Sequence, residues 1–375
     1  MSGLPEEAYA VALASLERMT TSRLTVLLSA LTPSEAFAAV CGEGAPVGLA
    51  GRLFDDAALT RSWRDGAARL DPETLWQRCV EQRIAVIVRG SPSYPALLAN
   101  DLAPPPVLFV RGNLDRLGGR RVGIVGTRNA TGSGRETASM LGRDLAAEGV
   151  HVVSGLARGI DGCAHRGSLS VDGGAGPIGV VGSGLDVVYP REHARLWEAV
   201  AERGALVSEA PPGAQPEAYR FPLRNRILAA LSEVLVVVES RESGGSLITV
   251  EEARLRSVTV MAVPGALRNR AAAGTNALLA DGCPIVTDTR DVLIALGLDT
   301  SRVGAVAYDA RPRPQRGDRP LLTLCTEPRT LDQFMLLTGL SLVECAMALA
   351  RLEAGGWVHQ VNGWFERAPA QVNFA

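Results

Sequence analysis

The feature that most constrains the fold of this 375-residue chain is a regular alternation of short apolar strands and helical stretches that begins at Arg120. The strand-like segments are rich in valine and isoleucine, and they lie at 122–125, 150–154, 178–181, 205–209, 234–239, 259–263 and 285–287. Helical segments lie between them, for example at 134–148, 194–203 and 247–256. Strands without a polar face are buried on both sides, so the pattern predicts helices on both faces of a mainly parallel sheet. We expect an α/β fold with an extended Rossmann-like, doubly wound domain.

Three further segments flank or follow this domain. Apolar residues at three- and four-residue spacings predict a helical N-terminal domain over residues 1–90. The Rossmann-like domain then covers 91–298, and residues 299–319 form a linker rich in arginine and proline. In residues 320–375, two helical stretches around Gly339 precede extended segments on either side of Asn362-Gly363. That order predicts a C-terminal winged-helix domain.

The chain contains no lysine, since all 38 basic residues are arginine. This composition excludes Schiff-base enzymes, the P-loop lysine and the protein-kinase lysine. An anion site must therefore use arginine, backbone N–H groups and helix N-termini. The net charge is only −2, so a nucleic-acid site must be a local cluster of arginines.

Other features of composition indicate the compartment. No apolar run approaches the roughly 20 residues that a membrane-spanning helix needs, and the acidic start leads into no signal-like apolar core. The six cysteines lie far apart without a CxxC pair, which predicts reduced thiols rather than disulfides or a zinc site. We expect a soluble cytoplasmic protein that does not contact a membrane.

Glycine, serine and arginine gather in the turns that follow the predicted strands. Ligands of open α/β sheets bind outside the carboxyl ends of the strands. Glycine lets the backbone approach a ligand, and N–H groups at helix starts bind anions. Several such turns in one row, together with four arginines, therefore predict an extended phosphate-binding surface: Arg128, Arg191, Arg224 and Arg226.

The sequence does not predict a cofactor, a metal or a catalytic centre. The first turn reads Gly-Thr-Arg-Asn-Ala-Thr-Gly-Ser-Gly rather than GxGxxG, and Ser154 stands where a dinucleotide site needs an acidic ribose ligand. Asp161 and His165 are four residues apart, and we interpret them as a helix N-terminal acid and a packed histidine. No serine lies in GxSxG with a histidine placed to complete a triad.

The order of these motifs resembles the DNA-processing protein A family (DprA/Smf) over about residues 94–298. The segments that carry the resemblance are Tyr94-Pro95, Pro105–Leu108, Val122–Arg128, Ser154–Asp161 with Ala164-His165, Gly182–Asp186, Tyr189-Pro190, Phe221–Ile227 with Leu231-Ser232, Val236–Glu239, Ser243-Gly244, Val263–Gly265 and Gly274–Asn276. Their spacing is far more specific than any single segment.

The resemblance implies a protein that binds and protects incoming single-stranded DNA, forms a homodimer through its Rossmann-like domain, and loads the RecA recombinase in natural transformation and homologous recombination. It implies no enzymatic activity. Phe221 is the candidate base-stacking residue. The candidate DNA phosphate ligands are Gly126, Thr127, Arg128, Ser154, Gly155, Gly159, Asp161, Gly182, Ser183, Gly184, Arg191, Arg224, Asn225, Arg226, Ser243 and Gly244.

Two parts of the chain depart from the family pattern. N-terminal domains of the family often resemble sterile-alpha or helix-hairpin-helix modules, but the expected glycine-rich hairpin is here Leu16–Thr20, which has no glycine. The winged-helix segment has only three arginines between 320 and 367 (Arg329, Arg351 and Arg367) against five acids: Glu327, Asp332, Glu344, Glu353 and Glu366. We expect it to contact protein or to regulate rather than to bind phosphate.

The alternative interpretation is that the chain is an enzyme. Ser243–Thr249 with Glu251-Glu252 resembles the GGxGTxxE loop of the LOG-like nucleotide 5′-monophosphate phosphoribohydrolases, in which a glutamate acts on the ribose of a bound monophosphate. Ser246 replaces a glycine of that motif, and the additional arginine turns have no role for a mononucleotide. We therefore favour the DNA-binding reading.

Overall fold

The computed structural model describes residues 3–44, 46–298, 308–309, 311–312, 314–315, 317–325, 327–361, 363–368 and 372–373. The chain divides into two compact units, residues 1–298 and 299–375. Each unit has an apolar core of its own.

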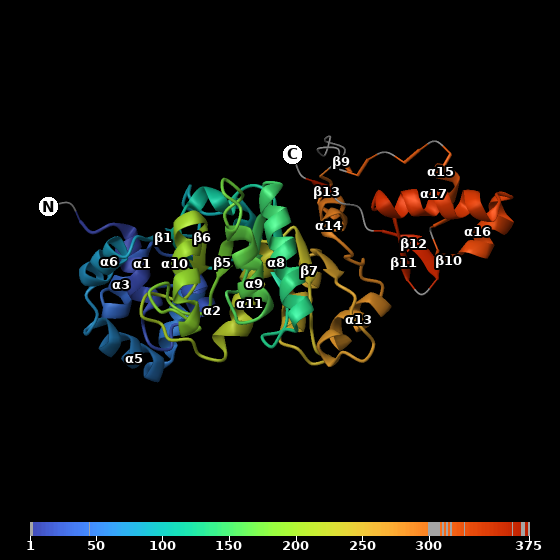
Figure 1. Ribbon diagram of the computed structural model, residues 1–375. Helices are drawn as coiled ribbons and strands as arrows, with labels where there is room; N and C mark the ends of the chain where they lie inside the picture. The colour runs from blue at the N-terminus through green and yellow to red at the C-terminus, as the bar shows by residue number, and fades with distance from the viewer. Residues whose placement is uncertain are drawn as a thin grey trace. The chain divides into compact units, whose positions relative to one another are not determined.

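Eight strands form one sheet in the first unit, in the order β1-β2-β6-β5-β4-β3-β7-β8 (Figure 1). Two strands at one end pair antiparallel: β1 (Ile84–Val88) and β2 (Val107–Gly112). The other six pair in parallel: β3 (Arg121–Val125), β4 (His151–Ser154), β5 (Ile178–Val180), β6 (Ala205–Ser208), β7 (Val234–Val237) and β8 (Thr259–Ala262). The chain runs outward from β3 to β6 and then returns to place β7 beside β3, so the strand order reverses between these two strands.

Helices cover both faces of this sheet. Val122 and Ile124 of β3 share a core with α8 (Gly132–Ala147), α9 (Ile160–Leu169) and α14 (Thr289–Ala295). Val125 belongs to the opposite core, with α11 (Arg220–Ala230), α12 (Ser246–Leu255) and α13 (Ala273–Ala280). Short helices lie in the connections: α7 (Ala96–Ala99) and the 3-10 turns Leu53–Asp55, Leu114–Leu117, Arg191–His193 and Arg270–Ala272. The structure confirms the predicted doubly wound, mainly parallel fold.

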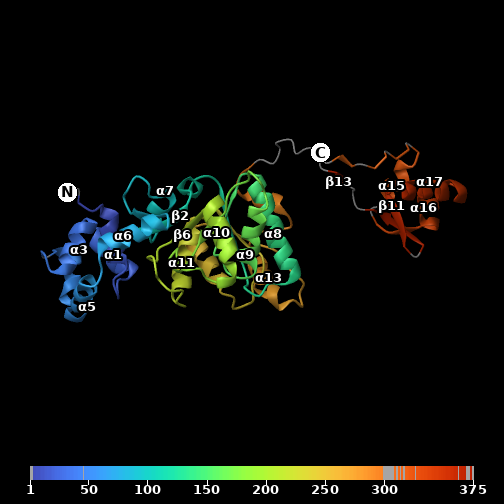
Figure 2. The same cartoon turned by 60° about the vertical axis from the view of Figure 1, so that its left-hand side comes forward.

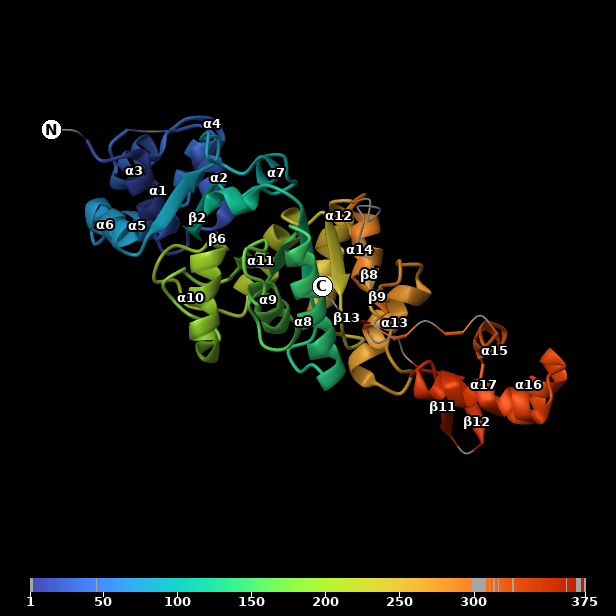
Figure 3. The same cartoon turned by 45° about the horizontal axis from the view of Figure 1, so that its top comes forward.

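Six helices precede the sheet: α1 (Glu6–Ala14), α2 (Thr21–Leu28), α3 (Pro33–Cys41), α4 (Gly48–Arg52), α5 (Ala57–Ala67) and α6 (Pro72–Glu81). The side chains of Thr20, Thr32, Asp56 and Asp71 accept backbone N–H groups at the starts of α2, α3, α5 and α6. Trp63 of α5 shares a core with Trp197 of α10 (Ala194–Arg203) and Val86 of β1. The N-terminal helices therefore pack at the β1–β2 end of the sheet (Figures 2 and 3).

The described part of the second unit contains three helices, two of them joined by a turn, and a small antiparallel sheet. Its helices are α15 (Arg319–Leu324), α16 (Leu331–Thr338) and α17 (Leu342–Ala354), and α16 and α17 meet at 114°. Gly339 ends α16 with φ 70°, a left-handed conformation that glycine adopts without a steric cost. The sheet has the order β10-β12-β11, from β10 (Arg329–Thr330), β11 (Val358–Val361) and β12 (Trp364–Arg367), while β9 (Tyr308–Asp309) pairs with β13 (Val372–Asn373).

Some expectations differ from the structure. Residues 285–287 were predicted as a strand, but Ile285 makes only an isolated bridge to Ala262, because the chain leaves the sheet edge at once to begin α14. One of the two antiparallel strands, β1, lies within the range 1–90 that was assigned to the helical N-terminal domain. All six cysteines lie among the described residues, and none is paired. No single helix of the described chain is both long and apolar enough to cross a membrane, although two sharply bent helix pairs satisfy that test together.

Candidate functional site

Three adjoining cavities lie in a row along the carboxyl ends of the parallel strands. The central cavity has a volume of about 280 Å³, the α12 cavity about 570 Å³ and the N-terminal cavity about 380 Å³. Arg128, Tyr189 and Phe221 line both the central and the α12 cavity. Val181 and Gly182 line both the central and the N-terminal cavity. Arg224 lines all three, so the row forms one candidate binding groove.

The central cavity is cationic and aromatic. Arg128, Arg158 and Arg224 line it, and no acidic side chain does. Arg128 is exposed and forms no ion pair with any described residue, whereas the guanidinium of Arg158 pairs with Glu192 outside the cavity. Such a lining suits an anion, because arginine can donate two parallel hydrogen bonds to a phosphate.

Two aromatic rings lie at the boundary between the central and the α12 cavity. The ring centroids of Tyr189 and Phe221 are 5.4 Å apart with an interplanar angle of 45°. The Arg128 guanidinium lies over the Phe221 ring, 5.2 Å from its centroid. Tyr189 is 38% exposed and Phe221 is half-buried, so both rings present surface on which a planar group can stack.

Arg224 is a buried cation in the floor of the groove. It is 6% exposed, its Nη1 donates to the carbonyl of Val180, and its Nε has no hydrogen-bond partner. Burial lowers the pKa of Arg224 to about 10, against the attraction of Asp161, so the guanidinium remains charged at neutral pH. Arg224 forms no hydrogen-bonded ion pair with any described residue, so the attraction of Asp161 offsets only part of the cost of burying its charge. A phosphate in the groove would supply a further negative charge beside this guanidinium.

Asp161 supports the same region from α9. Its carboxylate accepts the N–H of Gly155 at 3.1 Å and lines the α12 cavity. Burial raises the pKa of Asp161, while the charge of Arg224 opposes that rise. The neighbouring His165 is completely buried, and burial lowers its pKa to about 3. His165 is therefore a neutral packed side chain.

The position that a dinucleotide pyrophosphate occupies in related folds is filled here by a carboxylate of the chain itself. Glu239, at the end of β7, accepts the Thr131 N–H at 2.9 Å and the Thr131 hydroxyl at 2.5 Å at the start of α8. Its carboxyl group also lies against Gly134, where an added Cβ would come within 2.4 Å of the Glu239 carboxyl carbon. The strand reversal between β3 and β7 thus holds a protein side chain in place of a cofactor.

Most of the predicted ligands lie along the groove. Those that line it are Gly126, Thr127, Arg128, Gly155, Asp161, Gly182, Ser183, Phe221, Arg224, Asn225 and Gly244. The structure does not bring the others into the lining. The Ser154 hydroxyl is fully buried and donates to the carbonyl of Ile124, and Gly159, with φ 74°, packs on the backbone of Thr127. Gly184 packs against the backbone at Pro211, and Arg191 and Ser243 are exposed outside the lining.

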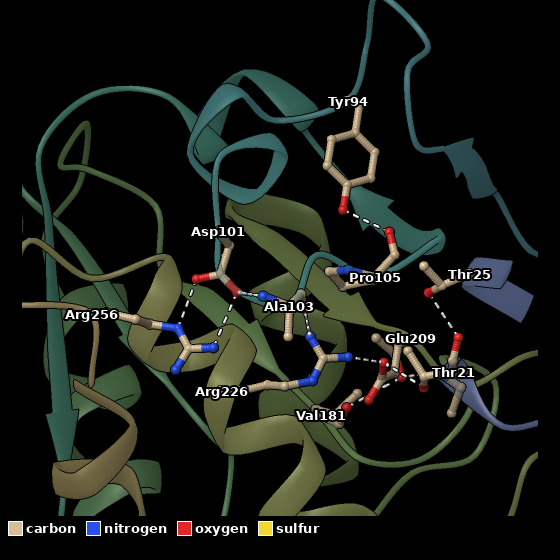
Figure 4. A network of polar contacts seen from close by, with 12 residues as sticks. Thr21, Thr25, Tyr94, Asp101, Ala103, Pro105, Val181, Glu209, Arg226 and Arg256 are labelled. Atoms are coloured by element: carbon tan, nitrogen blue, oxygen red, sulfur yellow. Dashed lines mark hydrogen bonds and ion pairs between the residues drawn. The ribbon is translucent and has the colours of Figure 1, made fainter. Parts of the chain in front are cut away.

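Arg226 does not line the groove. Its guanidinium pairs with Glu209 and donates to the carbonyl of Ala103, and Glu209 also accepts the hydroxyl of Thr21 at 3.1 Å (Figure 4). Arg224 and Arg226 are two apart on α11, and residues at that spacing lie on different sides of a helix. Arg226 therefore ties α11 to the end of β6 and the start of α2.

The lining also includes an aromatic residue and several arginines that were not among the predicted ligands, among them Tyr189, Arg158 and Arg241. Tyr189 belongs to a motif that carried the family resemblance, but its ring contact with Phe221 joins residues distant in sequence. Arg158 follows β4, and Arg241 follows β7, as exposed arginines in strand-end turns. Their position after a strand is a signal that sequence reasoning could have used.

Comparisons with known proteins give a consistent result. The model of the DNA recombination-mediator protein A family matches residues 85–297. The chain is 40% identical over 213 residues to DNA processing protein DprA of Bacillus subtilis (strain 168), covering 56% of this chain and 71% of the relative. It is 33% identical over 330 residues to Protein Smf of Synechocystis, covering 78% and 82%.

Solved structures resemble the fold as well. DNA processing protein A from Streptococcus pneumoniae superposes with a TM-score of 0.63 at 30% identity, covering 78% of this chain and 98% of that one. DNA processing protein A from Helicobacter pylori, whose structure concerns its single-stranded DNA binding mode, gives a TM-score of 0.51 at 26% identity, covering 58% and 97%.

Proposed function

Because the chain belongs to the DNA recombination-mediator protein A family, we propose that it binds single-stranded DNA along the groove at the carboxyl ends of its parallel strands. The observation that carries this proposal is the central cavity, where Arg128 and the buried Arg224 lie beside the rings of Tyr189 and Phe221. The two guanidinium groups supply phosphate contacts, and the two rings supply a stacking surface.

The groove favours a single strand over a duplex for a physical reason. Phe221 is half-buried between the central and the α12 cavity, so a base must leave any duplex stack to reach it. Unpairing costs a few kcal/mol for duplex DNA and is already complete in a single strand. Stacking on an aromatic ring does not depend on base identity, so we expect little sequence preference.

The proposed role, in natural transformation and homologous recombination, is to protect incoming single strands and to load RecA onto them. We propose that the protein does this in the cytoplasm, as a homodimer formed through the Rossmann-like domain.

The C-terminal unit is proposed as a winged-helix module that contacts protein. Its helix α17 exposes Leu342, Val343 and Met347, and its arginine Arg351 pairs with Asp318 at 2.7 Å. Such a helix face lacks the free cations that a DNA backbone requires.

We propose no reaction for the α12 cavity. A phosphoribohydrolase would need a glutamate of the α12 loop directed at a bound ribose. Here Glu251 pairs with Arg254 at 3.2 Å and Glu252 pairs with Arg256 at 2.5 Å, and neither lines the cavity. Incubation with AMP should therefore release no free adenine, and release of adenine would support the enzymatic alternative.

The proposed function is tested by a gel-shift comparison of single-stranded DNA with blunt duplex of equal length. We expect the single strand to bind more tightly. Equal or tighter binding of the duplex would overturn the assignment.

A further inference from the structure

The N-terminal cavity joins two parts of the chain that the sequence separates. One wall is the segment between α1 and α2, including Leu16, Arg18 and Met19. The opposite wall comes from the ends of β5 and β6 and from the start of α11. Arg18 has φ 61°, so this hairpin adopts the left-handed turn that glycine usually provides. The glycine-free hairpin thus lies beside the groove.

The start of α11 divides the N-terminal cavity from the central one. Tyr219 lines the N-terminal cavity, and Phe221, two residues later, lines the central cavity. Tyr219 is 54% exposed, and the Arg220 guanidinium lies 5.2 Å from the centroid of its ring. Arg224 lines both cavities, so a strand bound at Arg224 has an aromatic side chain on either side of it.

The charges in the two cavities differ. Three arginines and no acid of the described chain line the central cavity, whereas three arginines and three glutamates line the N-terminal cavity: Arg18, Arg220, Arg224, Glu17, Glu209 and Glu217. Glu209 is fixed in that wall by Thr21 and Arg226 (Figure 4). A lining with equal numbers of positive and negative groups gives a phosphate little net attraction. A neutral ligand that has hydrogen-bond donors and acceptors can bind both kinds of group. A nucleobase is such a ligand, and carboxylates accept hydrogen bonds from its amino groups.

We propose that the N-terminal cavity is a second nucleobase site, in which Tyr219 stacks on one unpaired base of a strand whose neighbouring phosphate lies at Arg224. This inference rests on the proposed function and deepens it, because it gives the N-terminal helices a direct part in DNA binding. It also predicts that the bound strand runs from the α12 cavity across Phe221 toward the α1–α2 segment.

Photo-crosslinking with a single-stranded oligonucleotide that contains 5-iodouracil tests this site on the unmodified chain. Trypsin cuts after Arg203, Arg220 and Arg224, so Tyr219 and Phe221 fall in different peptides, residues 204–220 and 221–224. We expect adducts on both peptides. Adducts confined to residues 221–224 would overturn the second base site and leave the proposed function standing.

Binding measurements test the proposed second base site independently of the crosslinking. Fluorescence anisotropy with a labelled deoxythymidine oligonucleotide should show that Tyr219→Ala weakens affinity about tenfold, equal to about 1.4 kcal/mol. Tyr219→Phe, which keeps the ring, should bind more tightly than Tyr219→Ala. Leu267→Ala is the matched control, because Leu267 is 97% exposed and lines none of the three cavities. Affinity of Tyr219→Ala equal to that of the control would refute the inference, whereas failure of the unmodified chain to bind any single strand would refute the proposed function itself.

Discussion

Replacement of Arg128 by alanine separates the two roles that an arginine at this position can have. Arg128 follows β3, is exposed, and forms no ion pair with any described residue. Its one described side-chain contact is the position of its guanidinium over the ring of Phe221, 5.2 Å from the centroid. A structural arginine would be tied to a carboxylate, whereas a phosphate ligand is left available for DNA.

The expected magnitudes follow from those contacts. An exposed cation–π contact contributes about 0.5–1 kcal/mol, so Arg128→Ala should lower the free energy of unfolding by less than about 1 kcal/mol. A charge-assisted hydrogen bond to phosphate contributes about 1.5–3 kcal/mol, so single-stranded DNA should bind roughly 10- to 150-fold more weakly. The salt dependence should also flatten by about 0.7 in log–log slope, the contribution of one phosphate contact to a single strand.

Arg226→Ala is the matched control, because the sequence also predicted Arg226 as a phosphate ligand. Its side chain is 10% exposed and pairs with Glu209, whose side chain is 15% exposed. Removing one partner of a buried pair leaves the other charge uncompensated and costs about 3–5 kcal/mol. At about 2–4 °C per kcal/mol for a unit of this size, the melting temperature should fall by roughly 6–20 °C.

Thermal melting followed by circular dichroism and anisotropy titration with single-stranded DNA measure both properties on each variant. The expected pattern is a stable Arg128→Ala protein that binds weakly and an Arg226→Ala protein that melts early. An Arg128→Ala protein that melts early and yet binds normally when folded would refute the assignment of Arg128 as a phosphate ligand.

Three further predictions address the ring, the buried histidine and the second unit. Phe221→Ala should weaken single-stranded DNA binding by about 1–3 kcal/mol in anisotropy titrations, and unchanged affinity would exclude stacking on this ring. Burial lowers the pKa of His165 to about 3 from an ordinary value of 6.5. As pH falls from 6.5 toward 3, the His165 imidazole therefore stays neutral in the folded chain but gains a proton in the unfolded chain. The free energy of unfolding should decrease by about 1.4 kcal/mol per pH unit over this range. In urea denaturation at about pH 7 and pH 5, His165→Leu should lose less stability than the unmodified chain; equal losses would contradict the shift. Deletion of residues 320–375 should leave single-stranded DNA affinity within about tenfold, and a larger loss would place DNA contacts in that segment.

The sheet could be predicted because the amino-acid composition of its strands indicates that they are buried. β7 is apolar throughout, and β3 and β4 are apolar between their polar end residues Arg121, His151 and Ser154, which is typical of strands buried on both faces. The antiparallel strands β1 and β2 precede the predicted alternation of strands and helices, and nothing local shows that they join the same sheet. Their pairing with β6 depends on contacts between residues far apart in sequence.

The sequence predicted which segments after the strands carry the candidate site, but not which side chains of each segment line it. The sequence places Phe221, Arg224 and Arg226 together after β6, but the structure shows that they lie on helix α11. Successive positions on a helix face different surroundings, which explains why Arg224 lines the groove and Arg226 is buried against Glu209. The division into three cavities likewise depends on tertiary packing, and no local pattern in the α1–α2 segment indicates that it borders the groove.

The measurement that tests the central claim most directly is the salt dependence of single-stranded DNA affinity for the unmodified chain, with duplex DNA of equal length titrated in parallel. Arg128, Arg224 and Arg241 line the groove, and two or three phosphate contacts predict a linear log–log plot with a slope of about −1.4 to −2.1. The account predicts that slope together with tighter binding of the single strand. Affinity that is independent of salt, or a duplex that binds as tightly as the single strand, would contradict it.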